Sequence, residues 1–224
     1  MFAVIFEVQP KKERWDDYLA LAQQLRPKLE AIDGFIANER FKSLRLDGKL
    51  LSLSIWRDEK AVIRWRTHGE HHDVQRKGRF EVFENYHLRV GEIVFDSDHP
   101  GGIADQQRFD ETEIGAAKAA TITELAWVDA RNAQTASSSL AAELGLEPHA
   151  RDLVEHEAFE SIYTPGKIVL LAFWRRSDAA EHWRPAAVNT IQSLRHRQVR
   201  VVRDYGMFER REAPQYYEEV SRRK

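Results

Sequence analysis

The pattern of apolar and polar positions runs through one cycle twice along the chain. Runs of β-branched and aromatic residues indicate strands, and apolar residues three or four apart indicate helices. In the first half these signals predict a strand, a helix, two strands, a helix and a strand, over 2–8, 11–31, 35–46, 49–56, the residues after Asp58, and 79–95. This β-α-β-β-α-β order is the ferredoxin-like arrangement.

Turn and cap residues fit these boundaries. Asp47-Gly48 separates the two central strands and predicts a type I′ hairpin, in which both turn positions have positive φ. Asp58 is placed to cap the second helix, and Gly34 to end the first one.

The cycle restarts after a polar stretch. It predicts strands over 119–128, 155–163, 167–174 and 199–209, a helix from Asp129 to Leu144, and a last helix capped by Ser177 or Asp178. We therefore expect one ferredoxin-like domain at 1–96 and a second at 117–214. Residues 97–116 are expected to form a linker, and residues 215–224 a polar tail.

Identities between the two halves indicate a tandem duplication. The stretch Trp56-Arg-Asp-Glu-Lys-Ala-Val-Ile-Arg-Trp65-Arg66 returns 118 positions later as Trp174-Arg-Arg-Ser-Asp-Ala-Ala-Glu-His-Trp183-Arg184, and it holds four of the six tryptophans. The same offset matches Glu39 with Glu157, Phe41 with Phe159, Ser43 with Ser161, Gly48 with Gly166, Lys49 with Lys167 and Leu53 with Leu171.

Duplication predicts how the sheets are buried. A lone ferredoxin-like sheet is covered by helices on one face only, and a second copy can cover the other face. The expected fold is α+β: two tandem βαββαβ domains that form an internal pseudo-dimeric α+β barrel, with the helices outside.

Composition excludes several classes of function. The absence of cysteine removes disulfides, thiolate metal sites and cysteine nucleophiles. A net charge of −2 gives no argument for nucleic acid, and no apolar run approaches the roughly 20 residues of a membrane span. The N-terminal stretch meets Glu7 and lacks a basic region, so no signal peptide is predicted. We expect a cytoplasmic protein without nucleic-acid or membrane partners.

Five stretches resemble the antibiotic biosynthesis monooxygenase (ABM) family. They are 54–66, 70–71, 75–79, 86–90 and 202–214, and the resemblance extends over both halves. It implies a dimeric α+β barrel with a pocket between sheet and helices in each half. It also implies the activities of characterised members, which include cofactor-independent oxygenation of aromatic polyketides and haem degradation.

His71 is the first candidate for chemistry, with His68 and His72 beside it as candidates for substrate binding. A pocket histidine can take a proton from a phenol or hydroquinone, so that the resulting carbanion meets dioxygen. It can also bind haem iron. The alternative is a run of partly exposed histidines at a helix end. His68 and His72 are four residues apart, which by itself is a weak metal-binding signal.

Trp65 is assigned to the catalytic pocket, and Trp56 and Arg66 to substrate binding. The alternative for both tryptophans is the core, and for Arg66 a set of seam salt bridges shared with Arg57, Arg79 and Glu39. In haem-degrading relatives, the resemblance places an iron-binding histidine ten residues after this tryptophan and an asparagine on the first strand. Here the tenth residue is Gln75 and the first strand has no asparagine. We therefore predict no cofactor, with haem as the less favoured alternative.

The two halves differ just downstream of the repeated tryptophan. His71 aligns with Asn189 and His68 with Ala186, so only the N-terminal half carries histidine chemistry there. We expect a monooxygenase with one competent pocket, in that half, which acts on a small aromatic or quinol-like molecule and dioxygen. A haem-binding or haem-degrading protein and a non-catalytic barrel for a small apolar ligand stay open, as does a further homodimer.

Overall fold

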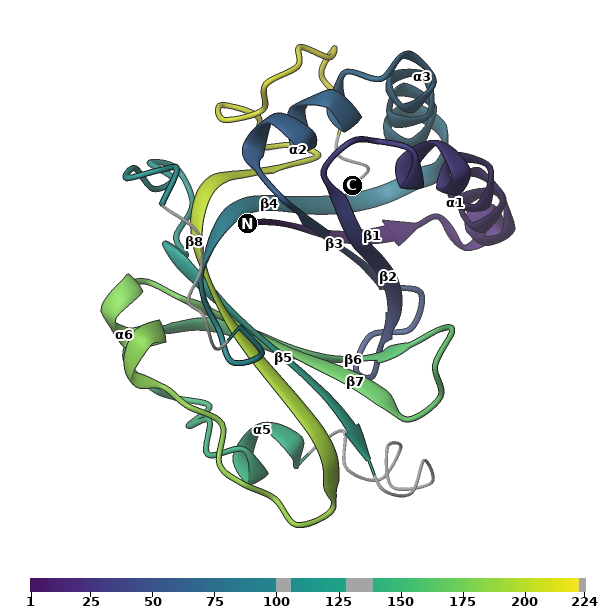
Figure 1. Ribbon diagram of the computed structural model, residues 1–224. Coiled ribbons are helices and arrows are strands. Elements are labelled where there is room, and N and C mark those ends of the chain that lie inside the picture. Colours follow the sequence, from purple (N-terminus) through teal and green to yellow (C-terminus); the bar gives the residue numbers. More distant parts are fainter. Residues whose placement is uncertain (100–105, 128–138, 222–224) are drawn as a thin grey trace.

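Eight strands form a closed barrel in this computed structural model, which describes residues 1–99, 106–127 and 139–221 (Figure 1). The strands are β1 (Phe2–Pro10), β2 (Phe35–Ser43), β3 (Leu50–Trp56), β4 (Phe83–Asp96), β5 (Ala119–Trp127), β6 (Leu153–Ser161), β7 (Lys167–Trp174) and β8 (Ile191–Gly206). Their order around the barrel is β1-β3-β2-β6-β7-β5-β8-β4, and every neighbouring pair is antiparallel. The expected α+β class and eight-stranded barrel are confirmed.

Each half contributes four neighbouring strands in the same order. The first half reads β4-β1-β3-β2 and the second reads β8-β5-β7-β6. Two seams join the halves: a short one, where Phe41 of β2 pairs with Ser161 of β6, and a long one, where β4 pairs with β8 from His87↔Gly206 to Asp96↔Arg197.

The helices lie outside the barrel (Figure 1). In the first half they are η1 (Lys12–Arg14), α1 (Trp15–Glu30), α2 (Glu59–Arg66), α3 (Gly69–Lys77) and the π-helical turn η2 (Gly78–Val82); in the second half they are α5 (Leu140–Glu143) and α6 (Ser177–His182). Asp58 caps α2 as predicted, because its carboxylate accepts a hydrogen bond from the Ala61 amide at 2.7 Å. The predicted helix from Asp129 falls largely on 128–138, outside the described residues.

The predicted two-residue hairpin turn is wrong. Strand β2 ends at Ser43 and β3 begins at Leu50, and within the described residues only glycines, Gly48 among them with φ 75°, have positive φ. The Ser43 hydroxyl accepts hydrogen bonds from the amides of Arg45 and Leu46, which stabilises a wider loop.

Two other boundaries also differ from prediction. The strand expected from Arg79 begins at Phe83, because α3 and η2 occupy the preceding residues. Ser177 is the first residue of α6, and the N-cap position falls on Arg176, which forms no side-chain cap. No helix in the described part of the chain is long and apolar enough to cross a membrane.

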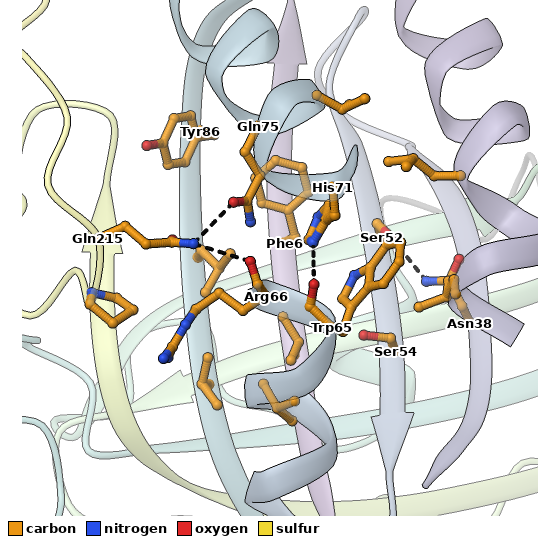
Figure 2. Close-up of a pocket in the computed structure, with 18 of the residues that line it drawn as sticks. Phe6, Asn38, Ser52, Ser54, Trp65, Arg66, His71, Gln75, Tyr86 and Gln215 are labelled. Atoms are coloured by element: carbon orange, nitrogen blue, oxygen red, sulfur yellow. Dashed lines mark hydrogen bonds between the residues drawn. The ribbon is translucent and has the colours of Figure 1, made fainter. Parts of the chain in front are cut away.

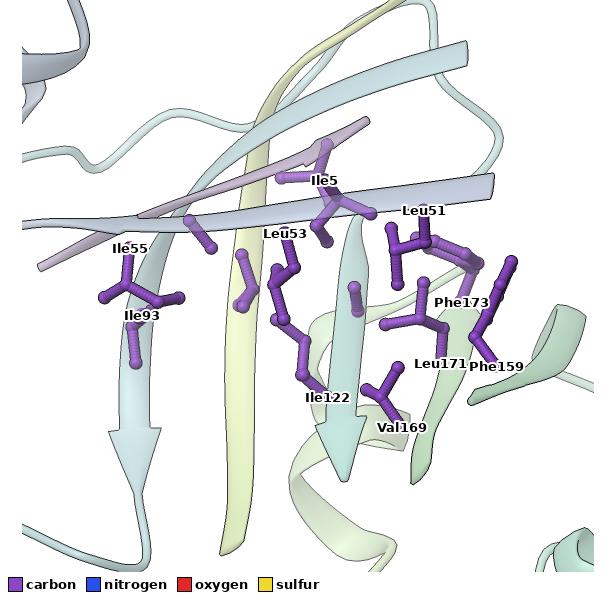
Figure 3. Close-up of a cluster of buried hydrophobic side chains, with 14 of the residues drawn as sticks. Ile5, Leu51, Leu53, Ile55, Ile93, Ile122, Phe159, Val169, Leu171 and Phe173 are labelled. Carbon is purple, nitrogen blue, oxygen red and sulfur yellow. The ribbon is translucent and has the colours of Figure 1, made fainter. Parts of the chain in front are cut away.

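Both halves fill the barrel interior with one apolar cluster (Figure 3). Ile5 and Leu53 come from the first half, and Phe159 and Leu171 from the second, each at most 4% exposed. Because strand side chains alternate between faces, the neighbours of Ile5 on β1 are left to face the helices. Burial of this apolar surface is the main force that holds the halves together.

Residues that are identical in the two halves bind each other across the short seam. Glu157 accepts hydrogen bonds from Ser43 at 2.5 Å and Lys49 at 2.6 Å. The matching residues reciprocate, because Glu39 accepts from Ser161 at 2.6 Å and from Lys167. Lys49 lies over the Phe159 ring, and Lys167 over the Phe41 ring. The repeated glutamate thus belongs to the seam. Arg57 instead pairs with Asp33, and Arg79 donates to the Met207 carbonyl.

Candidate functional site

A cavity of about 200 Å³ lies between the first-half sheet and helices α1, α2 and α3. Val4 and Phe6 form part of its floor, because they alternate with the barrel-facing residues of β1. Leu25 and Leu29 of α1 close one wall, and Val62 of α2 closes another. The cavity is mainly apolar, and a few polar side chains converge on it, as in small-molecule sites.

His71 lies in this cavity on the first turn of α3 (Figure 2). Its ring stacks on the Trp65 indole, with centroids 4.0 Å apart and planes inclined by 15°. His71 Nδ1 is 2.9 Å from the Trp65 carbonyl oxygen. A carbonyl only accepts hydrogen bonds, so Nδ1 carries the proton and Nε2 keeps its lone pair. The end of α2 therefore fixes both the position and the tautomer of the imidazole.

Burial lowers the pKa of His71 to about 4, because the charged ring loses its hydration. The hydrogen bond to Trp65 raises this pKa, and the neighbouring His68 and His72 lower it further. His71 is therefore neutral at pH 7. A neutral imidazole with a free Nε2 is a proton acceptor, and a negative charge formed beside it would stabilise its protonated form.

The chain after β8 closes the cavity on a further side; we call residues 207–221 the C-terminal strap. Gln215 donates to the Arg66 carbonyl at 3.1 Å and to the Gln75 side-chain oxygen at 3.3 Å (Figure 2). Arg210 donates to the Tyr86 hydroxyl at 2.7 Å. This segment had been expected to be a polar tail and the end of a strand, yet its contacts make it a wall of the first-half pocket.

The structure brings together three of the six residues singled out from the sequence. Trp65, Arg66 and His71 line the cavity. His68 is adjacent, with its ring centroid 6.0 Å from that of Trp65, but it is not part of the lining.

The other two candidates lie elsewhere. His72 is exposed, and its Nδ1 is 3.2 Å from the hydroxyl of Tyr217 in the strap. Trp56 is fully buried against Phe35, and its indole N–H donates to Ser54 at 2.9 Å. Neither residue lines the cavity. All six functional assignments stay predictions.

Sequence reasoning missed the polar residues that strands contribute to the cavity. Asn38 of β2 lines it and donates to Ser52 of β3 at 3.0 Å. Arg203 and Tyr205 of β8 and Tyr86 of β4 also line it. Their signal was polar or amphipathic residues at every second position of strands that are otherwise apolar on that face.

Haem remains untested as a ligand. Gln75 lines the cavity at the place where the resemblance puts the iron ligand, and amides are not among the usual axial ligands of haem iron. Of the histidines, His71 alone is in the lining. The part of the chain that the structure describes contains no cluster of three or more His, Cys, Asp or Glu suited to a metal ion.

The corresponding region of the second half is filled with side chains. Trp183, the counterpart of Trp65, packs against Trp174 with ring centroids 5.9 Å apart and edge-on against His196 at 5.3 Å. Residues 183–190, which follow α6, form no helix like α3. Leu140 and Leu144 complete this apolar cluster.

Comparisons with known proteins give one family and one fold. The family described as antibiotic biosynthesis monooxygenase matches residues 1–77. Jasmonate monooxygenase ABM of Pyricularia oryzae is 40% identical over 227 residues, which cover 99% of this chain and 100% of that protein. Uncharacterized protein YqjZ of Bacillus subtilis is 30% identical over 92 residues, which cover 41% of this chain and 78% of that protein. A solved aldoxime dehydratase (OxdRE) in complex with butyraldoxime has a TM-score of 0.56 at 11% identity, covers 89% of this chain and 79% of its own, and bears on the fold alone.

Proposed function

The chain belongs to the antibiotic biosynthesis monooxygenase family, and we propose that it is a monooxygenase that inserts oxygen from dioxygen into a small apolar organic molecule. The pocket of the N-terminal half is the proposed site, and His71 is the proposed base. The arrangement that carries the proposal is the neutral His71 ring, stacked on Trp65 inside a mainly apolar cavity with Nδ1 bonded and Nε2 free.

For an anthrone-type or hydroquinone-type substrate, the chemistry needs no reductant beyond the substrate. Nε2 of His71 takes a proton from the acidic C–H or O–H group, and the electron-rich carbanion forms a C–O bond with dioxygen. The resulting hydroperoxide loses water, so that a CH₂ group and O₂ give a C=O group and H₂O. The substrate supplies all the electrons, and the apolar walls keep water from reprotonating the carbanion.

The low pKa of His71 is compatible with this role. Proton transfer places a substrate anion next to the imidazolium, and an opposite charge within about 4–6 Å favours the charged form of histidine. The base would therefore strengthen as the reaction proceeds, while the empty site keeps it unprotonated.

The name of the Pyricularia oryzae relative makes jasmonate a reasonable trial substrate. Hydroxylation of a C–H bond that is not acidified converts RH and O₂ into ROH and H₂O only with two electrons and two protons from a donor. An assay with jasmonate therefore includes NADH and a flavin reductase as electron source, whereas the anthrone assay omits them.

We also propose that residues 1–96 and 117–214 are copies of one ferredoxin-like unit that together form an intramolecular pseudo-dimer. Support comes from the shared strand order and from the reciprocal contacts of Glu39 and Glu157. A cytoplasmic location and a further homodimer remain predictions.

Oxygen consumption with anthrone tests the proposed function. We expect uptake by the wild-type protein and a loss of at least about 100-fold in His71→Ala, the lower end of what a general base contributes. The matched control is His182→Ala on the exposed end of α6, which should keep full activity. Circular dichroism confirms that both variants fold. Undiminished uptake in a folded His71→Ala protein would remove the proposed base, and no uptake with either substrate by the wild type would remove the monooxygenase.

A further inference from the structure

Two arginines in the pocket have no acidic partner. Arg66 ends α2, and its Nε is buried without a hydrogen-bond partner. Arg203 projects from β8 into the same cavity. Within residues 1–99, 106–127 and 139–221, neither guanidinium has a carboxylate within 4.0 Å. Elsewhere, buried arginines are paired, as Arg89 is with Glu7 at 2.8 Å and Arg197 with Asp96 at 3.0 Å. Burial without a counter-ion is costly, so these guanidinium groups are suited to an anion from outside the chain.

The pocket as a whole is positively charged. Arg40 and Arg210 line it together with the two unpaired arginines, and the one lining carboxylate is that of Glu59. Arg108 already pairs with Glu59, at 2.6 Å. The excess of positive charge is therefore not neutralised by the lining.

The unpaired groups converge near Tyr205. Burial raises the pKa of this phenol to about 12, while the positive charges of Arg66, Arg210 and Arg203 each act to lower it, so all three guanidinium groups lie close to it. Arg210 is held by the Tyr86 hydroxyl and, at 2.8 Å, by the Gln215 carbonyl. Arg66 and Arg203 keep their donors for a ligand.

The acid nearest to Arg203 is Asp110, because the positive charge of Arg203 contributes to its lowered pKa. That carboxylate pairs with Arg108 and forms no ion pair with Arg203 within 4.0 Å. The guanidinium of Arg203 is therefore available to the cavity.

We propose that Arg66 and Arg203 bind the carboxylate of an organic acid whose apolar body fills the cavity against Trp65 and His71. The inference rests on the proposed function for the reaction and goes beyond it in the class of substrate. Guanidinium groups match a carboxylate with parallel N–H donors, and the mainly apolar walls suit a body without further charge. Because Arg66 directly follows Trp65, one turn of α2 carries both the anchor and the surface on which His71 stacks (Figure 2).

Binding of 4-phenylbutanoate and its methyl ester, measured by isothermal titration calorimetry at pH 7.5, tests the inference without any turnover. The two probes share an apolar body and differ in charge. We expect the wild type to bind the acid at least about tenfold more tightly than the ester, as charge-assisted hydrogen bonds require. Arg66→Gln and Arg203→Gln should each weaken the acid by about tenfold and leave the ester unchanged.

The matched control is Arg64→Gln, because Arg64 lies on the same helix, is exposed and faces Asp33. Arg66→Lys, which keeps the charge and loses the planar fork, should recover part of the affinity. Equal affinity for acid and ester, no binding of the acid by the wild type, or an equal loss in Arg64→Gln would overturn the inference. Arginine-dependent acid binding by a protein that takes up no oxygen would support the anchor and overturn the monooxygenase.

Discussion

The two halves of the barrel show which parts of a duplicated sequence stay under a shared constraint and which do not. Glu39 and Glu157, together with their serine and lysine partners, form matching contacts at the seam, where each copy needs the other. Downstream of Trp65 and Trp183 the copies differ: one continues into α3 and a cavity with His71, and the other packs its tryptophan into a core. Assembly thus depends on both copies equally, and chemistry is assigned to one.

The largest expected effect comes from exchanging the aligned residues of the two halves. His71→Asn installs the residue found at position 189, removes the proposed base, and should lower oxygen uptake with anthrone by about 100-fold or more. The reciprocal Asn189→His should gain no activity, since position 189 is exposed and lies outside the cavity. Initial rates in an oxygen electrode measure both. Activity gained by Asn189→His would show that the second half has a competent site as well.

Symmetric substitutions at the seam should instead have similar consequences. Glu157→Ala leaves Lys49 without one of its carboxylates and should lower the free energy of unfolding by about 3 kcal/mol, and Glu39→Ala by about 2 kcal/mol because Glu39 is more exposed. Urea denaturation provides the values.

Lys42→Ala is the control within the same seam, since its pair with Glu160 is half exposed on the lysine side and should contribute under about 1 kcal/mol. A loss for Glu157→Ala no greater than that for Lys42→Ala would contradict a reciprocal seam.

The strap is a third point of difference, because the C-terminal segment of the second half closes the pocket of the first. Gln215→Ala removes two hydrogen bonds to the pocket wall and should weaken binding of 4-phenylbutanoate by roughly 3- to 10-fold, with little change in stability. Calorimetric titration measures the affinity. Unchanged affinity would mean that the strap is not part of the site. Tyr216→Ala, at a strap residue that is 90% exposed, is the control.

The smallest expected effect is on the pH dependence of stability, and here the halves should agree. Burial lowers the folded-state pKa of both His71 and His196 to about 4, whereas an unfolded histidine titrates near 6.5. Between these values the unfolded chain binds the extra protons, so stability should fall as the pH drops from about 6.5 to 4.

Melting temperatures of the wild type, His71→Asn, His196→Asn and the double variant measure this dependence. Each single substitution should flatten the decline, and the double variant should flatten it most. A decline as steep in the double variant as in the wild type would show that these histidines do not cause it.

The barrel could be predicted because its causes are local or repeated. Strand and helix periodicities gave the element order, and the tryptophan repeat gave the duplication, which supplies a second sheet to bury the first. The turn at Asp47-Gly48 was mispredicted because the side chain of Ser43, several residues away, stabilises a wider loop. Helix α3 was missed because Gly69–Lys77 is polar and has no buried residue to provide an apolar period.

The site could be predicted only in part for a similar reason. His71, Trp65 and Arg66 are near one another in the sequence, and the cavity holds all three. Arg203 and Gln215 reach it from the far end of the chain, through the β4–β8 pairing and the strap, which no local pattern reveals.

The central claim is that one pocket, in the N-terminal half, is the binding site. A crystal structure with 4-phenylbutanoate bound would test it most directly. The account predicts one molecule per chain between the β1–β4 sheet and α1–α3, with its carboxylate at Arg66 and Arg203 and its ring near His71 and Trp65. A molecule bound beside Trp183, or at a surface distant from His71, would contradict it.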